Sequence, residues 1–188
     1  ESLGHQIIKP VPSLFSFSCK DKKLNNCKGV GLKNLHFEIN LNNKRFNSQG
    51  DLLITHWGFS GPGILRLSSE AARELYEQKY NFKLRIKWTN LDFSELKNRI
   101  DELRESHGKS NLCNSRPISS LTRRLWVYLL NKLELDNSKT WSEILSEERH
   151  KIINILLSDE YQISGKRPFS DEFVTSGGVS LDEVSFKT

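Results

Sequence analysis

The chain has 188 residues and a formal net charge of +5 at pH 7, and this length fits one large domain or two small ones that share a core. Hydrophobic residues make up 36% and charged residues 27%, which is the balance of a globular protein. No run of about 18 apolar residues occurs, so we expect no membrane span and no membrane partner. Because the chain has neither a signal-peptide pattern nor a Met, we expect a cytoplasmic fragment of a longer protein.

The cysteines and the basic residues define no site by their spacing. Cys19, Cys27 and Cys113 lack the spacing of metal ligands, so we expect reduced thiols and no metal site. Lysine and arginine are spread along the chain instead of clustering with aromatic residues, which favours a solvated surface and makes a nucleic-acid partner unlikely. The positive charge could also face an acidic partner domain or an anionic cofactor.

The first half of the chain has the alternation of β-strands. Apolar residues occupy every second position in 13–19 and in 35–41, and a short apolar segment follows at 52–55. Residues 42–44 are a turn candidate. Segment 82–88 has one apolar and one basic face, which predicts a half-buried antiparallel strand.

The middle of the chain changes to helical periodicity. Asp92 and Glu95 have the spacing of a capping box and predict a helix. Pro117 suits the first turn of a second helix, Thr140 is expected to cap a third, and 147–157 predicts a further one. Three or four amphipathic helices in a row predict a small bundle.

Strand character returns at 161–164 and 173–175. We therefore predict an α+β fold, in which an antiparallel β-barrel or curled sheet carries an inserted helical-bundle subdomain. The barrel part would comprise 1–90 and 160–188, and the helical subdomain 91–159.

A glycine-rich connection, GDLLITHWGFSGPG, occupies 50–63 and leads from a strand into a helix predicted over about 62–78. Its glycines let backbone N–H groups approach a ligand, and the helix N-terminus adds a partial positive charge. His56 is placed as a site residue would be, between the strand end and the glycine turn. A ligand-free strand-to-helix connection is the alternative, and the pattern alone favours it.

A second glycine segment, VTSGGV, occupies 174–179 and follows KRPF at 166–169. Its two adjacent glycines permit a positive φ or the close approach of another backbone or a ring. A hairpin turn is the alternative, which the pattern alone favours. Neither glycine segment supplies the GxGxxG of a dinucleotide site, and Ser60 does not lie in a GxSxG elbow.

Taken together, these segments resemble a known family. GDLLITHWGFSGP at 50–62 is similar to the GELLFTHFGLSGP signature of the YhiN/BaiN-type NAD(P)/FAD-dependent oxidoreductases. GHQI at 4–7, followed by two prolines, resembles the segment that opens the insert of that family. Segments 166–169 and 174–184 are similar to its closing TRPF…VTxGGVSLxEI. The order and approximate spacing of all three match over essentially the whole chain.

The resemblance implies that the whole chain is one insert of a larger flavoprotein, in which a barrel and a helical subdomain close over the flavin. FAD would belong to the parent protein, with none bound to this chain alone, and redox chemistry would be the cofactor's. The implied partners are the FAD-binding domain of the same parent chain and a small-molecule substrate. The residues implied to face flavin and substrate are Thr55, His56, Gly58, Ser60, Gly61, Thr175, Gly177 and Gly178.

Two other functions stay open at the level of the sequence. One is a basic module that binds nucleic acid, and the other is a purely structural interaction domain. Binding to DNA or RNA that weakens as ionic strength rises would favour the first.

Overall fold

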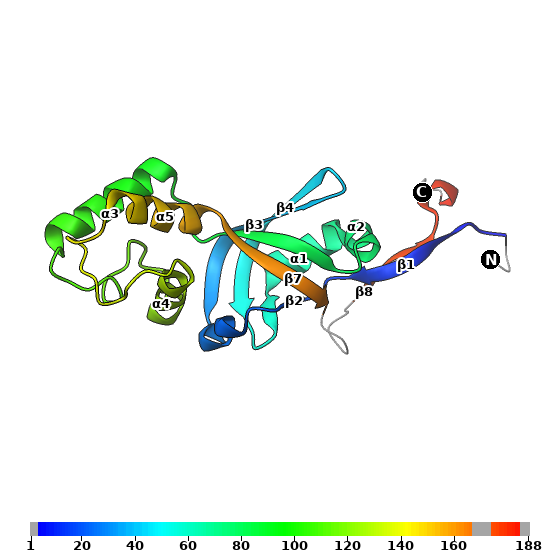
Figure 1. The fold of residues 1–188 in the computed structure, drawn as a ribbon. Helices are drawn as coiled ribbons and strands as arrows, with labels where there is room; N and C mark the ends of the chain where they lie inside the picture. The colour runs from blue at the N-terminus through cyan, green and yellow to red at the C-terminus, as the bar shows by residue number, and fades with distance from the viewer. Residues whose placement is uncertain (1–3, 167–173, 185–188) are drawn as a thin grey trace.

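The computed structural model describes residues 4–166 and 174–184. The molecule is elongated, with a β-barrel between a group of helices at one end and a two-stranded ribbon at the other (Figure 1). The barrel is closed, in the strand order β2-β5-β4-β3-β6-β7, and its strands pair antiparallel. The predicted α+β class, with an antiparallel barrel and helices, is confirmed. The barrel strands are β2 (Phe17–Cys19), β3 (Gly31–Leu41), β4 (Lys44–Ile54), β5 (Gly58–Ser60), β6 (Asn81–Lys87) and β7 (Asp159–Lys166).

The longer barrel strands follow the alternation read from the sequence. In β3, Leu35, Phe37 and Ile39 are buried, and the residues between them face outward or are half-buried. The hairpin to β4 closes through Asn42 and Asn43, whose φ values are 48° and 62°. Asparagine tolerates this left-handed conformation, and a two-residue turn of this kind matches the twist of the strands. The predicted turn is therefore confirmed.

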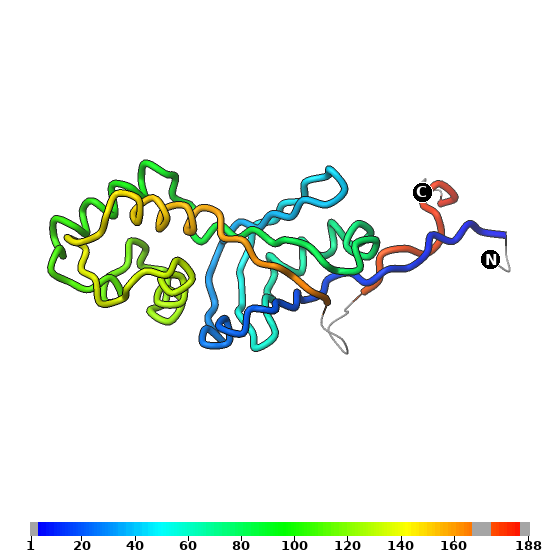
Figure 2. The backbone as a smooth tube through the Cα atoms, in the orientation of Figure 1, coloured from blue at the N-terminus to red at the C-terminus, as the bar shows by residue number. Residues whose placement is uncertain are grey.

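A ribbon outside the closed barrel is formed by β1 (Ile7–Ser13) and β8 (Val174–Val179). The single strand predicted over 13–19 is divided, because Leu14 adopts a φ of 55° and ends the extended backbone. The chain then enters the barrel at β2. Both ends of the described chain lie at the outer end of the ribbon (Figure 2), where His5 Nδ1 lies 2.9 Å from Glu183 Oε2.

Two short helices cover the barrel wall where one helix was expected. They are α1 (Pro62–Glu70) and α2 (Ala72–Glu77), and the backbone between them leaves helical geometry at Ala71, with a φ of −103°. Ile64 and Leu67 of α1 are fully buried. Pro62 occupies the first turn of α1, where its missing N–H leaves no helical hydrogen bond unmade.

The helical part lies between β6 and β7 in the sequence and contains α3 (Phe93–Ser106), α4 (Arg123–Lys132) and α5 (Ser146–Leu157). The capping box is confirmed, since Asp92 accepts the N–H of Glu95 and Glu95 accepts that of Asp92. Short 3-10 helices occur at η1 (Lys22–Cys27) and η2 (Leu181–Glu183).

Two predicted helix starts are wrong. Pro117 is buried in a loop, and α4 begins later, where Thr122 Oγ1 accepts the N–H of Leu125 over 3.3 Å. Thr140 does hydrogen-bond to Glu143, but the bond closes a separate turn, and the next helix, α5, begins only at Ser146. The buried Trp141 within that turn stacks on Trp126, with 6.4 Å between ring centroids. Side-chain packing therefore fixes both loops.

A buried charge joins the helical part to the barrel. Asp159, 2% exposed at the start of β7, accepts Lys132 Nζ from α4 over 2.5 Å and Trp88 Nε1 over 2.9 Å. Lys132 Nζ also lies 3.7 Å from the centre of the Tyr161 ring. The hydrophobic core continues from the barrel into the helical part without interruption, so these contacts lie at a packed junction.

Candidate functional site

The glycine-rich connection folds as a tight turn between β4 and β5. The backbone N–H of Thr55 donates to Gly58 O over 2.8 Å, and its hydroxyl donates to the same oxygen over 3.1 Å. The hydroxyl also accepts the N–H of Gly58 over 3.2 Å. Because Thr55 is buried and its hydroxyl closes the turn, its hydrogen bonds serve the chain itself.

Gly58 and Gly61 allow close backbone packing. A β-carbon at Gly58 would lie 2.3 Å from Phe17 O, and one at Gly61 would lie 2.7 Å from Asp51 O. Their φ values are 149° and 103°, a region that L side chains rarely adopt. These two glycines thus let β5 lie against β2 and let α1 begin against β4. Their contact with a ligand stays a prediction.

The remaining two residues of this group differ in exposure. His56 is exposed, and its ring lies edge-on to Trp57, with 4.2 Å between centroids. Ser60 is half-buried and its hydroxyl accepts Ser16 Oγ over 2.8 Å. Of these two residues, only His56 is exposed.

Thr175, Gly177 and Gly178 lie on the ribbon, within β8. The hairpin turn favoured by the pattern is therefore wrong, since these residues pair with β1, Thr175 with Pro12 and Gly178 with Ile8. A β-carbon at Gly177 would lie 2.8 Å from Ile8 O, whereas one at Gly178 would meet nothing within 4 Å. The predicted close approach of another backbone is confirmed at Gly177, and open space remains beside Gly178.

The two groups of predicted residues occupy different parts of the molecule. Residues 55–61 belong to the barrel wall, and 175–178 belong to the ribbon. Among the described residues, no hydrogen bond or strand pair joins the two groups. Each contacts the N-terminal segment, since Ser60 bonds Ser16 and Thr175 pairs with Pro12.

A third region has no counterpart among the sequence predictions. A surface hollow of about 440 Å³ lies between the barrel and the helical part, and we call it the junction hollow. Its lining includes Lys33 of β3, Arg99 of α3 and Arg116 in the loop before α4. No local signal connects these residues, because they come from three separate segments that only the fold brings together.

Two of the three cysteines are protonated thiols. Burial raises the pKa of the Cys27 thiol to about 11, and burial also raises that of Cys19, so both stay protonated at neutral pH. In the part of the chain that the structure describes, all three cysteines are free thiols and no cluster of metal-binding side chains occurs. Within that same part, no helix is long and apolar enough to cross a membrane.

Comparisons with known proteins agree with this architecture. The family model described as "HI0933-like protein barrel and H2TH domain" matches residues 11–174. Among curated proteins, the "Ribosomal RNA dihydrouridine synthase" of Escherichia coli (strain K12) is 28% identical over 138 residues. The match covers 73% of this chain and 32% of that relative, so the aligned region spans about a third of the relative's length.

Proposed function

The chain belongs to the HI0933-like protein barrel and H2TH domain family, and from that membership we propose that it is one domain of a larger flavin-dependent oxidoreductase that reduces a uridine in ribosomal RNA. The observation that carries the proposal is the likeness to a relative named ribosomal RNA dihydrouridine synthase. Under this proposal, the unspecified small-molecule substrate expected from the sequence becomes a base within an RNA chain.

The charge of the chain supports an RNA substrate. RNA is a polyanion, and proteins that bind it neutralise phosphates with lysine and arginine. The net charge is +5, and the spread of basic residues along the sequence favours a solvated surface. The fold nevertheless brings three basic residues together at the junction hollow. This grouping weakens the interpretation that the basic residues only form a solvated surface.

The neighbouring positions of residues 5 and 183 fit the proposed insertion into a parent chain. A domain inserted into another leaves and re-enters its host at neighbouring points. Here His5 and Glu183 contact each other, and the N–H of Gln6 donates to Glu183 Oε1 over 3.0 Å. The ribbon of β1 and β8 would then be the connection to the FAD-binding domain.

The described residues fit the cover of a flavin ring better than a complete FAD site. Gly178 combines a φ of 124° with open space where a β-carbon would lie, so a flat ring could approach the ribbon there, beside the exposed Thr175. The corresponding space at Gly58 and Gly61 is filled by the chain's own backbone. The phosphates of FAD would be held by the FAD-binding domain of the parent protein.

This division assigns separate tasks to cofactor and chain. A bound flavin, reduced by NAD(P)H, would supply a hydride to one carbon of the uracil double bond, and a proton from an acidic group or from solvent would be added to the other carbon. The residues of this chain would position the RNA and exclude water from the reacting base. His56 and Ser60 would lie nearest the base, and Gly178 would lie against the ring.

The reaction itself tests the proposal. The full-length protein, with bound flavin and NAD(P)H, is incubated with ribosomal RNA that lacks dihydrouridine. We expect one uridine to gain the mass of two hydrogen atoms, detected by mass spectrometry of RNA fragments. Turnover should slow in Ser60→Ala and Gly178→Val variants that retain flavin. A flavin-loaded protein that leaves every uridine unchanged would refute the assigned substrate.

A second experiment tests where FAD is bound. The isolated chain, titrated with FAD, should show no detectable binding, because the phosphate-binding elements would lie in the parent's other domain. Tight stoichiometric binding, measured by calorimetry, would contradict this arrangement.

A further inference from the structure

The junction hollow is a preformed site at the contact between barrel and helices. Its floor includes the fully buried Trp88, whose indole N–H is fixed by Asp159 and whose backbone N–H donates to Leu156 O over 2.9 Å. One wall is the loop after Arg116, held in place by the buried Pro117. Because these buried residues fix the floor and the wall, a ligand would meet a shape that already exists.

The lining has positive charge without compensation. It contains Lys33, Arg99 and Arg116, and none of its residues is acidic. Among the described residues, Lys33 and Arg116 have no ion-pair or hydrogen-bond partner. Arg99 Nη1 lies 3.8 Å from Glu102 Oε2 between two exposed side chains, a contact of little strength.

Several cations elsewhere in the chain are paired with carboxylates, whereas no residue that lines the hollow is acidic. Lys132 pairs with Asp159, Lys139 with Glu148, and Arg149 with Asp101. Like charges gathered without a counter-charge repel one another, and an anion in the hollow would relieve that repulsion. The hydroxyl groups of Ser119 and Ser120, which also line it, are donors suited to phosphate oxygens.

A second hollow, of about 570 Å³, lies on the barrel and is lined by charges of both signs, including Lys87 and Glu38. Glu38 pairs there with Arg45 and Arg85. The junction hollow differs from it, because its own lining contains no acidic residue.

We propose that the junction hollow binds the phosphodiester backbone of the RNA substrate, with Lys33, Arg99 and Arg116 as the phosphate-binding residues. This assignment rests on the proposed function, since it names where that substrate is held. It also implies that the helical part binds RNA, because Arg99 and Arg116 belong to that part.

A pair of charge-matched variants tests the site in the full-length, flavin-loaded protein. One variant carries Lys33→Ala, Arg99→Ala and Arg116→Ala. The control carries Lys20→Ala, Lys79→Ala and Lys109→Ala, three exposed lysines outside the hollow, so both lose the same net charge. Binding of a fluorescent oligouridylate is measured by anisotropy over a series of salt concentrations.

We expect the hollow variant to bind at least about tenfold more weakly at roughly 0.1 M salt, and the slope of log K against log salt to fall by about 0.7 for each phosphate that the variant no longer neutralises. The control should change affinity by less than about threefold, with its slope retained. Arg116→Lys alone should keep most of the affinity, because it keeps the charge.

The possible failures are distinguishable. Equal RNA binding by the hollow variant and the control would overturn the assignment of the hollow and leave the proposed function standing. A wild-type protein without salt-dependent RNA binding would overturn the proposed function. Loss of bound flavin from the hollow variant, with RNA binding retained, would assign the hollow to a flavin phosphate and overturn the RNA site.

Discussion

Gly177 and Gly178 are adjacent residues with similar backbone conformations and different surroundings. Their φ values are 133° and 124°, so alanine at either position is strained by about 1–3 kcal/mol. Only Gly177 has the backbone of β1 within 2.8 Å of the added β-carbon. We expect Gly177→Ala to lower the free energy of unfolding more than Gly178→Ala does, as measured by urea denaturation. Equal losses would show that β1 and β8 are not packed so closely.

The ion pair of Lys132 with Asp159 gives a second prediction for single residues. Removing one partner of a buried pair leaves a charge without compensation. We expect Lys132→Met to lower the free energy of unfolding by about 3–5 kcal/mol at neutral pH, and Lys132→Met with Asp159→Asn to recover part of that loss. Lys83→Met, which breaks an exposed pair with Glu160, should cost less than about 1 kcal/mol.

The pH dependence of this variant has a definite sign. Burial raises the pKa of Asp159 above its usual 3.8, and Lys132 opposes that rise. A raised pKa means that the folded state favours the protonated acid. The contribution of Asp159 to the free energy of unfolding is therefore largest below pH 3.8, and it is lost as the pH rises through the pKa of the folded state. The cost of Lys132→Met should therefore shrink on acidification. A cost that is independent of pH would contradict the burial of this charge.

The sequence predicted the conformation and burial of single residues well where local rules determine them. It predicted them less well where tertiary contacts determine them. The left-handed turn at Asn42 and Asn43 and the buried positions of β3 were predictable. Trp88 was correctly placed on the apolar face, but its hydrogen bond to Asp159 joins residues far apart in the chain. Phe93, the first residue of α3, is 40% exposed, although α3 packs on α5.

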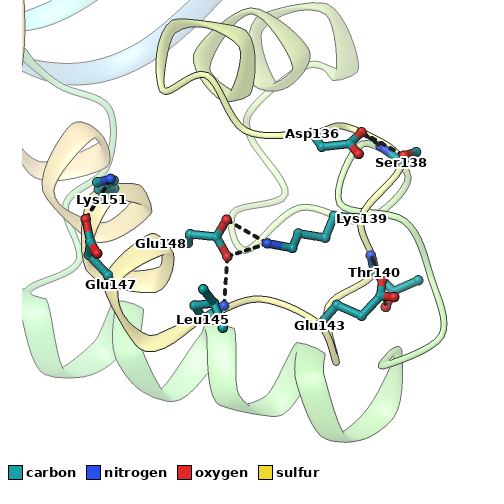
Figure 3. Close-up of polar contacts among 9 residues, drawn as sticks. All are labelled: Asp136, Ser138, Lys139, Thr140, Glu143, Leu145, Glu147, Glu148 and Lys151. Carbon is teal, nitrogen blue, oxygen red and sulfur yellow. Dashed lines mark hydrogen bonds and ion pairs between the residues drawn. The ribbon is translucent and has the colours of Figure 1, made fainter.

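Among the elements, the start of α5 combines a helix cap with an ion pair (Figure 3). Glu148 accepts the N–H of Leu145 over 2.8 Å and Lys139 Nζ at 2.8 and 2.9 Å. The hydrogen bond from Lys139, followed by that from Leu145, lowers the pKa of Glu148 below its usual 4.5. A group with a lowered pKa stabilises the folded state when the pH is above its usual pKa. That stabilisation is lost as the pH falls through the pKa of the folded state.

A Glu148→Gln variant tests this cap. We expect its Tm to be lower by about 2–4 °C at neutral pH, since such a contact contributes on the order of 1 kcal/mol. The difference should shrink as the pH falls below 4.5 and through the lowered pKa of the folded state. Glu105→Gln, which changes an exposed side chain of α3, should show neither effect. If the Tm difference persists in acid, the lower Tm of Glu148→Gln results from changed packing and not from the lost charge.

The elements also show why strands were predicted better than helices. Strand alternation, as in β6, has a period of two and needs only a few residues to be recognised. The hydrogen bonds of a helix cap form equally well in a turn, as Thr140 and Glu143 show. The stacked Trp141 and Trp126 then decide the conformation through packing, and that packing has no local signature.

At the scale of the molecule, the barrel with its helical part could be expected from the order of the elements, and the junction hollow could not. One continuous core runs through both parts, so the arrangement of Lys33, Arg99 and Arg116 around a single hollow depends on packing between distant segments. The two glycine segments were grouped by their likeness to a family. The structure places them on the barrel wall and on the ribbon.

Photochemical crosslinking tests the central claim most directly, namely that this chain forms the substrate side of a flavin-dependent enzyme acting on ribosomal RNA. The full-length, flavin-loaded protein is bound to a ribosomal RNA fragment with 4-thiouridine at the position that is reduced, and the crosslinked peptides are identified by mass spectrometry. We predict crosslinks within 55–61, the segment proposed to lie nearest the reacting base. Crosslinks confined to parts of the protein outside this chain would contradict the account.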